Sequence, residues 1–392
     1  MSRGPGRRSV ASGIGLGLAA GAAGAPAASG VPAQAEPEER LRADVEAVAA
    51  TGVVAVVARV ETPGGAVAAT AGEAALGTGR PVPPGALVRV GSTSKPFLAV
   101  VVLQLAEEGV LSLEEPVEHR LPGLLRGGGN DGRALTVRQL LQHTGGVFDY
   151  LSDAEAMPQW RSAEAFRALR FRRYAPAELI RIALRHPPDF PPGTGFAYSN
   201  TGYQLLALIV EQATGLPWEA QVARRVLRPL GLRDTLLPGD DPAIRGPHPR
   251  GYWRFPDAAG LTDVTVVNQT MAGACGAIVS TAADITRFFG ALLGGLLLSP
   301  GTLAAMRSTV PAAGDIAAAW PGSGYGLGLQ WVPQGGYWGH NGDTLGYSTR
   351  TGATADGSRR FFACVTGYAG PPTEEALTTL AARALGGDAS GG

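Results

Sequence analysis

The chain has 392 residues, 45% of them hydrophobic, and 33 basic and 33 acidic residues give a formal net charge of +0. This length allows two domains, or one domain with a large insertion. The balanced charge argues against a nucleic-acid-binding surface or a polybasic membrane patch. No cysteines or histidines show metal-ligand spacing, so we expect neither a metal site nor another cofactor. Cys275 and Cys364 have small apolar neighbours, which favours buried free thiols over a disulfide.

The N-terminus is typical of an export signal. A basic start ending in Arg7-Arg8 precedes a weakly apolar, Gly/Ala-rich stretch at 10–28, and Ala33-Gln34-Ala35 supplies a small-x-small cleavage pattern. The stretch is too rich in small residues for a good transmembrane helix. We therefore expect residues 1–35 to direct secretion by the twin-arginine or the Sec route, with no stable membrane span. A disordered tail on a cytoplasmic protein is the alternative.

The first part of the chain has the pattern of a sheet flanked by helices. Apolar spacing predicts a helix over 36–50, and β-branched runs predict a hairpin of strands at 53–60 and 66–70. A short strand at 87–90 leads to Gly91, and the apolar residues that follow predict a helix from about 93 to 108. Residues three apart share a helix face, so Ser92 and Lys95 can touch.

The middle of the chain has a different character, because strand signals are sparse and helical segments alternate with Pro/Gly-rich loops. The predicted helices cover 136–142, 163–170, 176–184, 202–213 and 217–226. We therefore predict that 111–265 is a mainly helical domain inserted into a sheet domain made of 36–110 and 266–385.

Strand signals return near the C-terminus. Alternating segments at 324–332, 335–340, 345–353 and 361–366 predict an antiparallel meander, and 282–293 and 373–384 have helical spacing. The predicted fold class is α/β (α+β), with an antiparallel β-sheet flanked by N- and C-terminal helices and an inserted all-helical domain. Residues 386–392 would form a disordered tail.

Lys95 is the only lysine in the chain, and it lies three residues after Ser92. Arginine stays protonated, whereas a desolvated lysine can give up its proton and act as a base. Acting as a base near neutral pH would need a lowering of the Lys95 pKa by roughly three units, which burial can supply. The helix N-terminus also favours an oxyanion and disfavours a second cation. An exposed helix surface is the commoner setting of a lone Ser-x-x-Lys pattern.

Two further motifs place polar groups on loops. Tyr198-Ser199-Asn200 follows a Pro/Gly-rich loop and precedes a helix, so it can aim a phenol and an amide at a substrate. Gly339-His340-Asn341-Gly342-Asp343 joins two predicted strands, where glycine lets a substrate approach the backbone closely. Taken singly, the first could be an ordinary helix cap and His340 a strand-end residue without a chemical role.

In this order and on these elements, the three motifs resemble those of the serine penicillin-recognising enzymes, the β-lactamase/transpeptidase-like superfamily. This superfamily includes D,D-peptidases, class C β-lactamases and related esterases. The resemblance runs from about residue 40 to 385 and is greatest to secreted D-alanyl-D-alanine carboxypeptidases. It implies a site between the sheet and the helical insertion. No G-x-S-x-G motif supports an α/β-hydrolase.

The resemblance assigns a role to each motif residue. Ser92 would be the nucleophile, Lys95 its activating partner, and Tyr198 a group exchanging protons with the nucleophile and the leaving group. Asn200 would orient the substrate amide or Lys95, and His340 would complete the polar wall. The oxyanion hole would use the backbone N–H groups of Ser92 and Asp343. The sequence leaves open whether Lys95 or Tyr198 takes the first proton from Ser92.

The substrate side departs from the carboxypeptidase pattern. Gln330 replaces an arginine, and Asn341 and Asp343 replace hydroxyl residues around Gly342; in the carboxypeptidases these groups hold the substrate's terminal carboxylate. Without that arginine a bidentate carboxylate partner is missing, and Asp343 would repel a carboxylate. Substrates without a free C-terminal carboxylate become more plausible.

We expect a secreted serine hydrolase that forms an acyl-serine intermediate. The family resemblance favours a D-alanyl-D-alanine carboxypeptidase-like peptidase acting on cell-wall-type D-peptides. The alternatives are an esterase, a class C-type β-lactamase or an amide-specific D-peptidase, and then a non-catalytic penicillin-binding module. The expected partner is a small-molecule or peptide substrate, such as a D-peptide, ester or β-lactam, and not a nucleic acid.

Overall fold

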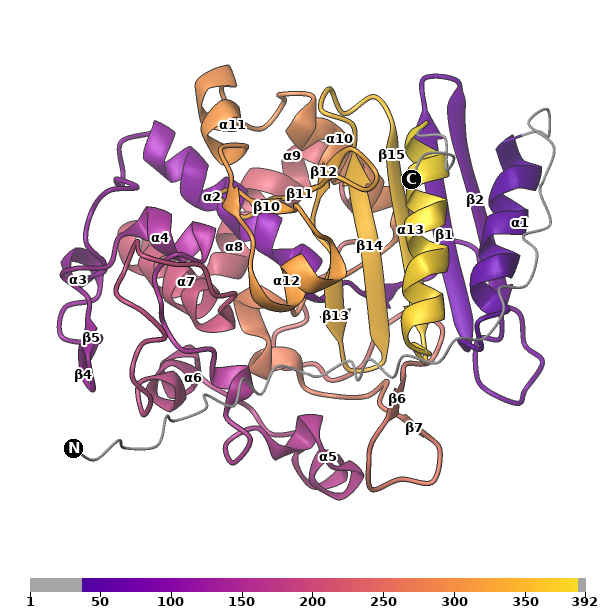
Figure 1. Cartoon of the computed structure of the whole chain (residues 1–392), viewed down its shortest axis with the longest axis horizontal. Coiled ribbons are helices and arrows are strands. Elements are labelled where there is room, and N and C mark those ends of the chain that lie inside the picture. The colour runs from indigo at the N-terminus through magenta and orange to yellow at the C-terminus, as the bar shows by residue number, and fades with distance from the viewer. Residues whose placement is uncertain (1–36, 387–392) are drawn as a thin grey trace, which may run out of the picture.

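The computed structural model describes residues 37–386, and its centre is a nine-stranded antiparallel sheet (Figure 1). The strand order is β2-β1-β15-β14-β12-β11-β10-β9, and β13 pairs with β14 beside this path. The strands are β1 (Ala55–Thr62), β2 (Gly65–Gly72), β9 (Val310–Pro311), β10 (Gly324–Tyr325), β11 (Gln330–Val332), β12 (Tyr337–Gly339), β13 (Gly342–Thr344), β14 (Tyr347–Ala353) and β15 (Arg360–Thr366).

Helices cover both faces of the sheet. The first and last helices, α1 (Pro37–Ala49) and α13 (Pro371–Leu385), pack against each other on one face, and α10 (Ala282–Leu293) packs on the other face against β1, β14 and β15 (Figure 1). Because helices cover both faces, β14 is buried throughout and β15 at every residue except the first. Only β15 shows the apolar run that is typical of such strands, whereas β14 carries several polar residues.

The remaining helices gather beside the sheet, at the left of Figure 1. The longer ones, α2 (Lys95–Glu107) and α7 (Asn200–Thr214), pack against each other and belong to one large hydrophobic core. The shorter ones are α3 (Val117–Arg120), α4 (Val137–Gln142), α5 (Ala163–Leu169), α6 (Pro176–Ala183), α8 (Trp218–Val222), α9 (Arg228–Leu230), α11 (Pro300–Met306) and α12 (Gly314–Ala319). Thr136 caps α4 with a full capping box, which fixes where that helix begins.

Three small two-stranded sheets lie outside the main one. They pair β3 (Val88–Arg89) with β8 (Val279–Ser280), β4 (Arg126–Gly127) with β5 (Asn130–Asp131), and β6 (Tyr252–Arg254) with β7 (Leu261–Asp263). The last two fall in the stretch that we predicted to be helical. Each is a local hairpin of two or three residues per strand, too short to produce a clear alternating pattern in the sequence.

The predicted fold class is confirmed, with corrections at the level of single elements. The predicted strand at 324–332 is two strands, β10 and β11, because the chain turns back at Gly326 and Gly328. A Cβ on Gly326 would lie 2.0 Å from the Met306 carbonyl oxygen, and Gly328 has a φ of +81°. Ser92 lies in a 3₁₀ turn, η1 (Gly91–Ser94), and α2 begins only at Lys95.

Other expectations concern the cysteines, the chain ends and the division into domains. Cys275 and Cys364 are both buried and free, as predicted. Within residues 37–386, no helix is long and apolar enough to cross a membrane. The predicted export signal at 1–35 and the tail after residue 386 lie outside the described residues, and the predicted domain division stays a prediction.

Candidate active site

Ser92 lies where the edge of the sheet meets the start of α2. Gly91 precedes it with a φ of +54°, and a Cβ there would lie 2.9 Å from the backbone oxygen of Asp343. Thr93 donates its hydroxyl to the backbone oxygen of His340 at 2.9 Å. Ser94 donates its hydroxyl to the Gly91 oxygen at 2.7 Å. The Thr93 side chain therefore ties η1 to the 339–343 segment, and the Ser94 side chain closes the turn itself.

Lys95 is fully buried directly behind Ser92. Its Nζ lies 3.0 Å from Ser92 Oγ, 2.8 Å from Asn200 Oδ1 and 3.0 Å from the Cys275 backbone oxygen. Burial lowers the pKa of Lys95 from 10.5 to about 8, although the nearby Asp149 carboxylate opposes the shift. The expected lowering of the pKa is therefore present, and an appreciable fraction of Lys95 is neutral at weakly alkaline pH.

Tyr198 and Asn200 enter the site from the start of α7. His143, in a left-handed conformation after α4, accepts a hydrogen bond from the Ser199 backbone N–H through Nδ1 at 3.1 Å. Its ring lies 4.2 Å, centroid to centroid, from that of Tyr198. Burial lowers the pKa of His143 well below its usual value, so the ring is neutral. His143 thus supports the Tyr198–Asn200 loop and does not touch Ser92.

The Tyr198 hydroxyl is buried, and no partner within residues 37–386 meets hydrogen-bond geometry with it. Burial raises the pKa of Tyr198 well above its usual value, and the nearby Ser92 hydroxyl opposes this shift only in part. The Lys95 Nζ lies 4.7 Å from the centre of the Tyr198 ring. Tyr198 is therefore a neutral phenol that can relay a proton, and Lys95 is the group in hydrogen-bond contact with the nucleophile.

The Asp343 backbone N–H points toward Ser92. A two-residue turn links β13 to β14, so Thr344 and Tyr347 form a hydrogen-bonded pair and Asp343 and Ser348 a non-hydrogen-bonded one. The polar backbone groups of Asp343 therefore face away from β14, toward Gly91. The N–H of Ser92, in the first turn of its helix, has no acceptor within that helix. The Asp343 backbone therefore lies against the Gly91–Ser92 segment, and the oxyanion hole stays a prediction.

Gly342 has a different role from the predicted one. A Cβ at this position would lie 2.1 Å from the Val90 backbone oxygen and 2.9 Å from the Thr93 backbone nitrogen. The missing side chain therefore lets β13 lie against η1, and this space is taken by protein and not by substrate. The expectation that Gly342 lets a substrate approach is corrected to a close backbone contact that places Asp343.

Gln330 and Asn341 are both buried, and they are linked. The Gln330 side-chain Oε1 accepts a hydrogen bond from the Asn341 backbone N–H at 3.0 Å, across the break between β12 and β13. Neither Oδ1 nor Nδ2 of the buried Asn341 side chain has a hydrogen-bond partner within residues 37–386. Gln330 is thus partly committed to holding the strand break. The Asn341 amide interacts only weakly, with the Tyr337 hydroxyl, and this contact opposes the raising of the Tyr337 pKa by burial.

Asp343 belongs to a charge cluster that the sequence did not reveal. Its Oδ1 lies 3.2 Å from Nη1 of the buried Arg350, and Arg350 also binds Glu374 on α13 through Nε at 3.0 Å and Nη2 at 2.5 Å. Two carboxylates therefore share one guanidinium, which leaves the cluster with a net negative charge. No pattern near Arg350 could have predicted this, because its partners come from β13 and α13.

His340 is buried and neutral, since burial lowers its pKa to about 3. Its Nδ1 donates to the Asn341 oxygen at 2.6 Å, so Nε2 accepts from the Tyr325 hydroxyl at 2.8 Å. The ring centres of His340 and Tyr198 are 6.3 Å apart. His340 is thus an uncharged group between Tyr325 and Tyr198, and its part in a polar wall stays a prediction.

Two further groups complete the site. Asp149, just before a 3₁₀ turn at Tyr150–Ser152, accepts a hydrogen bond from Asn200 Nδ2 at 2.9 Å. The Cys275 carbonyl accepts from Lys95, as described above. A backbone acceptor leaves no trace in a sequence, and an isolated aspartate gives no signal by itself. For clarity, Ser92, Lys95, Tyr198, Asn200, Asp149 and the Cys275 carbonyl are called the base cluster, and Gln330, His340, Asn341, Gly342 and Asp343 the strand segment.

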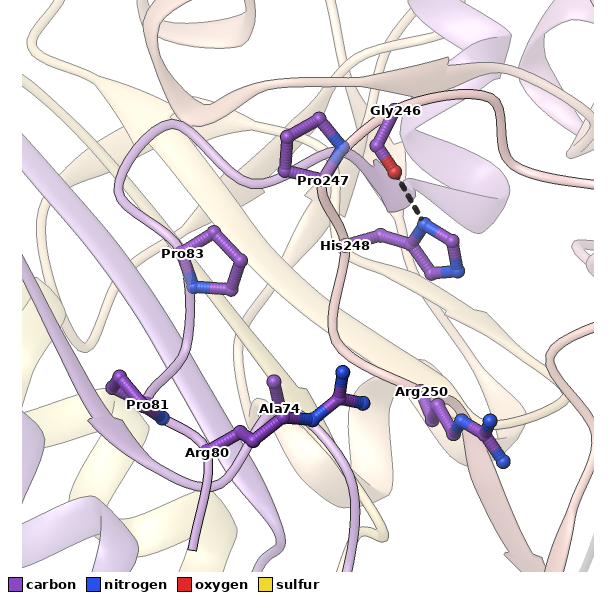
Figure 2. A pocket seen from close by; sticks show the side chains of 8 residues that line it. All are labelled: Ala74, Arg80, Pro81, Pro83, Gly246, Pro247, His248 and Arg250. Atoms are coloured by element: carbon purple, nitrogen blue, oxygen red, sulfur yellow. Dashed lines mark hydrogen bonds between the residues drawn. The ribbon is translucent and has the colours of Figure 1, made fainter. Parts of the chain in front are cut away.

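A pocket of about 370 Å³ is lined by other residues, between the 74–83 loop and the 246–250 segment (Figure 2). Arg80 and Arg250 supply its cationic side chains, His248 adds an imidazole, and prolines supply much of the rest. His248 Nδ1 donates to the Gly246 oxygen at 2.7 Å, and Arg250 is paired with Asp263 at 2.8 Å. None of the base cluster or the strand segment lines this pocket.

Comparison with known proteins agrees with the geometry. Residues 39–386 match the family model described as beta-lactamase. Penicillin-binding protein 4 of Amycolatopsis lactamdurans is 30% identical over 285 residues, which cover 69% of each chain.

Among solved structures, a D-stereospecific amidohydrolase from Streptomyces sp. is similar with a TM-score of 0.80 and 34% identity, covering 87% of this chain and 98% of that one. The D-amino acid amidase of Ochrobactrum anthropi SV3, in complex with L-phenylalanine amide, gives a TM-score of 0.76 and 25% identity, covering 88% of this chain and 97% of that one.

Proposed function

The chain belongs to the beta-lactamase family of serine hydrolases, and on that basis we propose that it is a D-stereospecific amidohydrolase working through an acyl-serine intermediate. The observation that carries the choice is the charge of the strand segment. The cation beside Asp343, Arg350, already binds the two carboxylates of Asp343 and Glu374. No arginine is left there to hold a substrate's terminal carboxylate, and an amide or ester has none to hold.

In the proposed acylation, Lys95 acts as the general base. A neutral lysine amine has two N–H groups and one lone pair. The Asn200 and Cys275 oxygens can only accept, so they take the two N–H groups, and the lone pair is left for the Ser92 hydroxyl at 3.0 Å. The Ser92 proton passes to Lys95 while Oγ bonds to the substrate carbonyl carbon. The negative charge on the carbonyl oxygen is stabilised by the N–H groups of Ser92 and Asp343.

Breakdown of the tetrahedral intermediate needs a proton on the departing amine. Lys95, now an ammonium, supplies it, and the neutral Tyr198 phenol beside Ser92 can relay it by giving one proton and taking another. The products are the free amine, or ammonia, and an ester between Ser92 and the acyl group. Water then attacks this ester by the same path, which releases the carboxylic acid and restores the Ser92 hydroxyl.

The strand segment supports recognition of an uncharged or cationic group. The unpaired Asn341 amide can both donate and accept a hydrogen bond, which suits a carboxamide. Asp343, with its side chain 57% exposed, adds negative charge at the rim. These features favour an amide-specific hydrolase over the carboxypeptidase activity that the family resemblance suggested. The similarity to a D-stereospecific amidohydrolase over 98% of that chain supports the same choice.

The decisive experiment compares kcat/KM for four substrates with the purified protein: D-phenylalanine amide, L-phenylalanine amide, a D-Ala-D-Ala peptide and the C-terminal amide of that peptide. We expect the D-amide to be preferred over the L-amide, and the peptide amide over the free acid. Preference for the free acid would return the assignment to a carboxypeptidase. Failure of the protein to form any covalent adduct at Ser92 with a fluorescent penicillin or an activated ester would contradict the acyl-serine chemistry itself.

We also propose that the enzyme is secreted, on the basis of the basic and Gly/Ala-rich pattern at 1–35. Expression of the full chain in a bacterium with both export routes should yield extracytoplasmic protein beginning at Glu36. Replacing Arg7 and Arg8 together by lysine would stop export by the twin-arginine route and leave Sec export intact. An uncleaved, cytoplasmic product would contradict secretion.

A further inference from the structure

We propose that Asp149 is a positioning residue for acylation: its carboxylate fixes the Asn200 side-chain amide so that Lys95 must direct its lone pair at Ser92. The inference rests on the acyl-serine chemistry proposed above. Three contacts carry it, namely Asp149 Oδ2 to Asn200 Nδ2 at 2.9 Å, Asn200 Oδ1 to Lys95 Nζ at 2.8 Å, and Lys95 Nζ to Ser92 Oγ at 3.0 Å.

The end of the Asn200 amide that faces Lys95 decides where the lysine lone pair points. An amide has an accepting oxygen and a donating nitrogen, and it fits its surroundings in either orientation until a neighbour decides. An ionised carboxylate can only accept, so Asp149 requires Nδ2 on its own side. Oδ1 is then turned to Lys95, where it takes one of the two N–H groups of the neutral amine.

The opposite orientation would inactivate the base. Nδ2 would face Lys95 Nζ, and its N–H would compete with the Ser92 hydroxyl for the single lone pair. An ammonium at Lys95 would also oppose this flip, but for the neutral lysine that acts as the base, Asp149 is the side chain within residues 37–386 that decides the orientation, because Oδ1 of Asn200 has Lys95 and Nδ2 has Asp149 as its partner. Asp149 is itself held in place, since its Oδ1 accepts from the Leu151 backbone N–H at 3.2 Å. The orientation of a catalytic lone pair is thus set by a residue that does not touch the nucleophile.

The protonation state of Asp149 matters for the same reason. Burial raises its pKa from 3.8 to about 6, against the hydrogen bonds from Leu151 and Asn200 and the charge of Lys95. A protonated Asp149 can donate to Asn200 Oδ1 and so permits the flip. The titratable groups that interact with Asp149 are Lys95 on α2, Tyr150 on its own turn, Tyr198 before α7 and Cys275 in the 3₁₀ turn at Gly273–Cys275.

The first test removes the acceptor and measures acylation with probes that have no ammonium group. Asp149→Leu should slow acylation of Ser92 by a neutral activated ester by about 10- to 100-fold, as expected for a misaligned catalytic group, with KM nearly unchanged. Asp284→Asn is the matched control. Asp284 is also buried with a raised pKa, but it binds Thr235 and the Asp234 backbone N–H and not the base cluster.

The second test is a rescue that a merely structural aspartate would not give. Asn200→Asp alone sets two carboxylates against each other and should abolish acylation. Adding Asp149→Asn restores the order of donors and acceptors, because the new amide at position 149 donates to the new carboxylate at position 200, and that carboxylate accepts from Lys95. We expect the double variant to recover at least about tenfold over Asn200→Asp, most clearly at alkaline pH, since a carboxylate beside Lys95 raises the lysine pKa.

The third test uses pH. Acylation by the wild type needs neutral Lys95 and ionised Asp149, so log kcat/KM should rise with a slope of one from about pH 6 to 8 and with a slope of two below about pH 6. In Asp149→Asn the slope should stay at one throughout. Because the pKa of Asp149 is raised from 3.8 to about 6 in the folded state, the native protein loses stability as the pH rises from about 4 to about 6, and the loss is complete above about pH 6. Asp149→Asn should therefore show a higher Tm than the wild type at pH 7 and an equal one near pH 4.

The outcomes separate this inference from the proposed function. If the wild type forms no adduct at Ser92, the acyl-serine chemistry fails. If it does, but Asp149→Leu is acylated at the wild-type rate, only the positioning role fails. A rise in KM confined to substrates with a free amino group would overturn positioning in favour of direct contact between Asp149 and the substrate. Absence of any rescue in the folded double variant would also overturn it.

Discussion

The base cluster and the strand segment meet at Ser92, but they differ in how completely their polar atoms are paired. In the base cluster, Lys95 has three hydrogen-bond partners, Asn200 is held between Lys95 and Asp149, and only the Tyr198 hydroxyl has no partner of hydrogen-bond geometry within residues 37–386. In the strand segment, Gln330 and His340 are paired, but neither polar atom of the Asn341 amide has such a partner in the same residues, and the Asp343 side chain is 57% exposed. A paired group keeps one geometry, whereas an unpaired buried amide gains by binding a ligand.

This difference indicates a division of labour. The base cluster is fixed before a substrate arrives, which is what transfer of a proton from Ser92 requires. The strand segment offers the Asn341 amide, and it offers the exposed Asp343 carboxylate, which is only partly engaged by Arg350. Changes in the base cluster should therefore remove activity toward every substrate, and changes in the strand segment should alter the order in which substrates are preferred.

The largest expected effect is from Lys95→Arg. Arginine stays protonated at every working pH, so Ser92 loses its base, and acylation should fall by at least about 10³-fold toward esters and amides alike. The measurement is the rate of adduct formation at Ser92 by mass spectrometry, with circular dichroism to confirm folding. Lys95→Met, which is of similar length and uncharged, is a second variant that tests the same loss of the base if the arginine variant misfolds. Acylation near the wild-type rate in both variants would assign the base role to Tyr198.

A smaller effect should follow from pH alone. Because the pKa of Lys95 is about 8, the neutral form is lost tenfold for each unit below that value, so kcat/KM at pH 6 should be about 100-fold below its alkaline plateau. The rising part of the pH profile of kcat/KM should lie at the same pH for an ester and an amide, since it reports the ionisation of Lys95 in the free enzyme. If the pH of this rise shifted with the substrate, a step other than proton removal from Ser92 would control the rate.

The smallest effect, and the one that tests the strand segment, comes from Gln330→Arg combined with Asp343→Thr. Together they add a cation and remove the exposed carboxylate. The ratio of kcat/KM for a D-Ala-D-Ala peptide to that for its amide should rise about 10- to 100-fold, as a charge-assisted hydrogen bond to the carboxylate allows. The rate of Ser92 acylation by a neutral activated ester should change little. Asp343→Thr alone shows how much of the effect is relief of repulsion; an unchanged ratio in the double variant would contradict the assigned role of this segment.

The sequence predicted the base cluster better than the strand segment. Ser92 and Lys95 are three residues apart, and Tyr198 and Asn200 two apart, so local spacing was enough to suggest that each pair acts together. Gly342 was misassigned because a close approach between two backbones looks the same in a sequence as a close approach to a ligand. Arg350 and Glu374 were missed because they meet Asp343 only through the pairing of β13 with β14 and the packing of α13.

By itself, the sequence predicted the fold class and singled out Ser92 and Lys95, because apolar periodicity and short-range motifs depend on neighbours within a few residues. Their roles as nucleophile and base are predictions from the family resemblance. Only the tertiary structure decided the state of these groups. Burial lowers the pKa of Lys95 and raises that of Asp149, and both shifts depend on desolvation by segments distant in the chain. The order Asp149, Asn200, Lys95, Ser92 joins three separate segments of the chain, and contacts at such separation are fixed only when the whole core has packed.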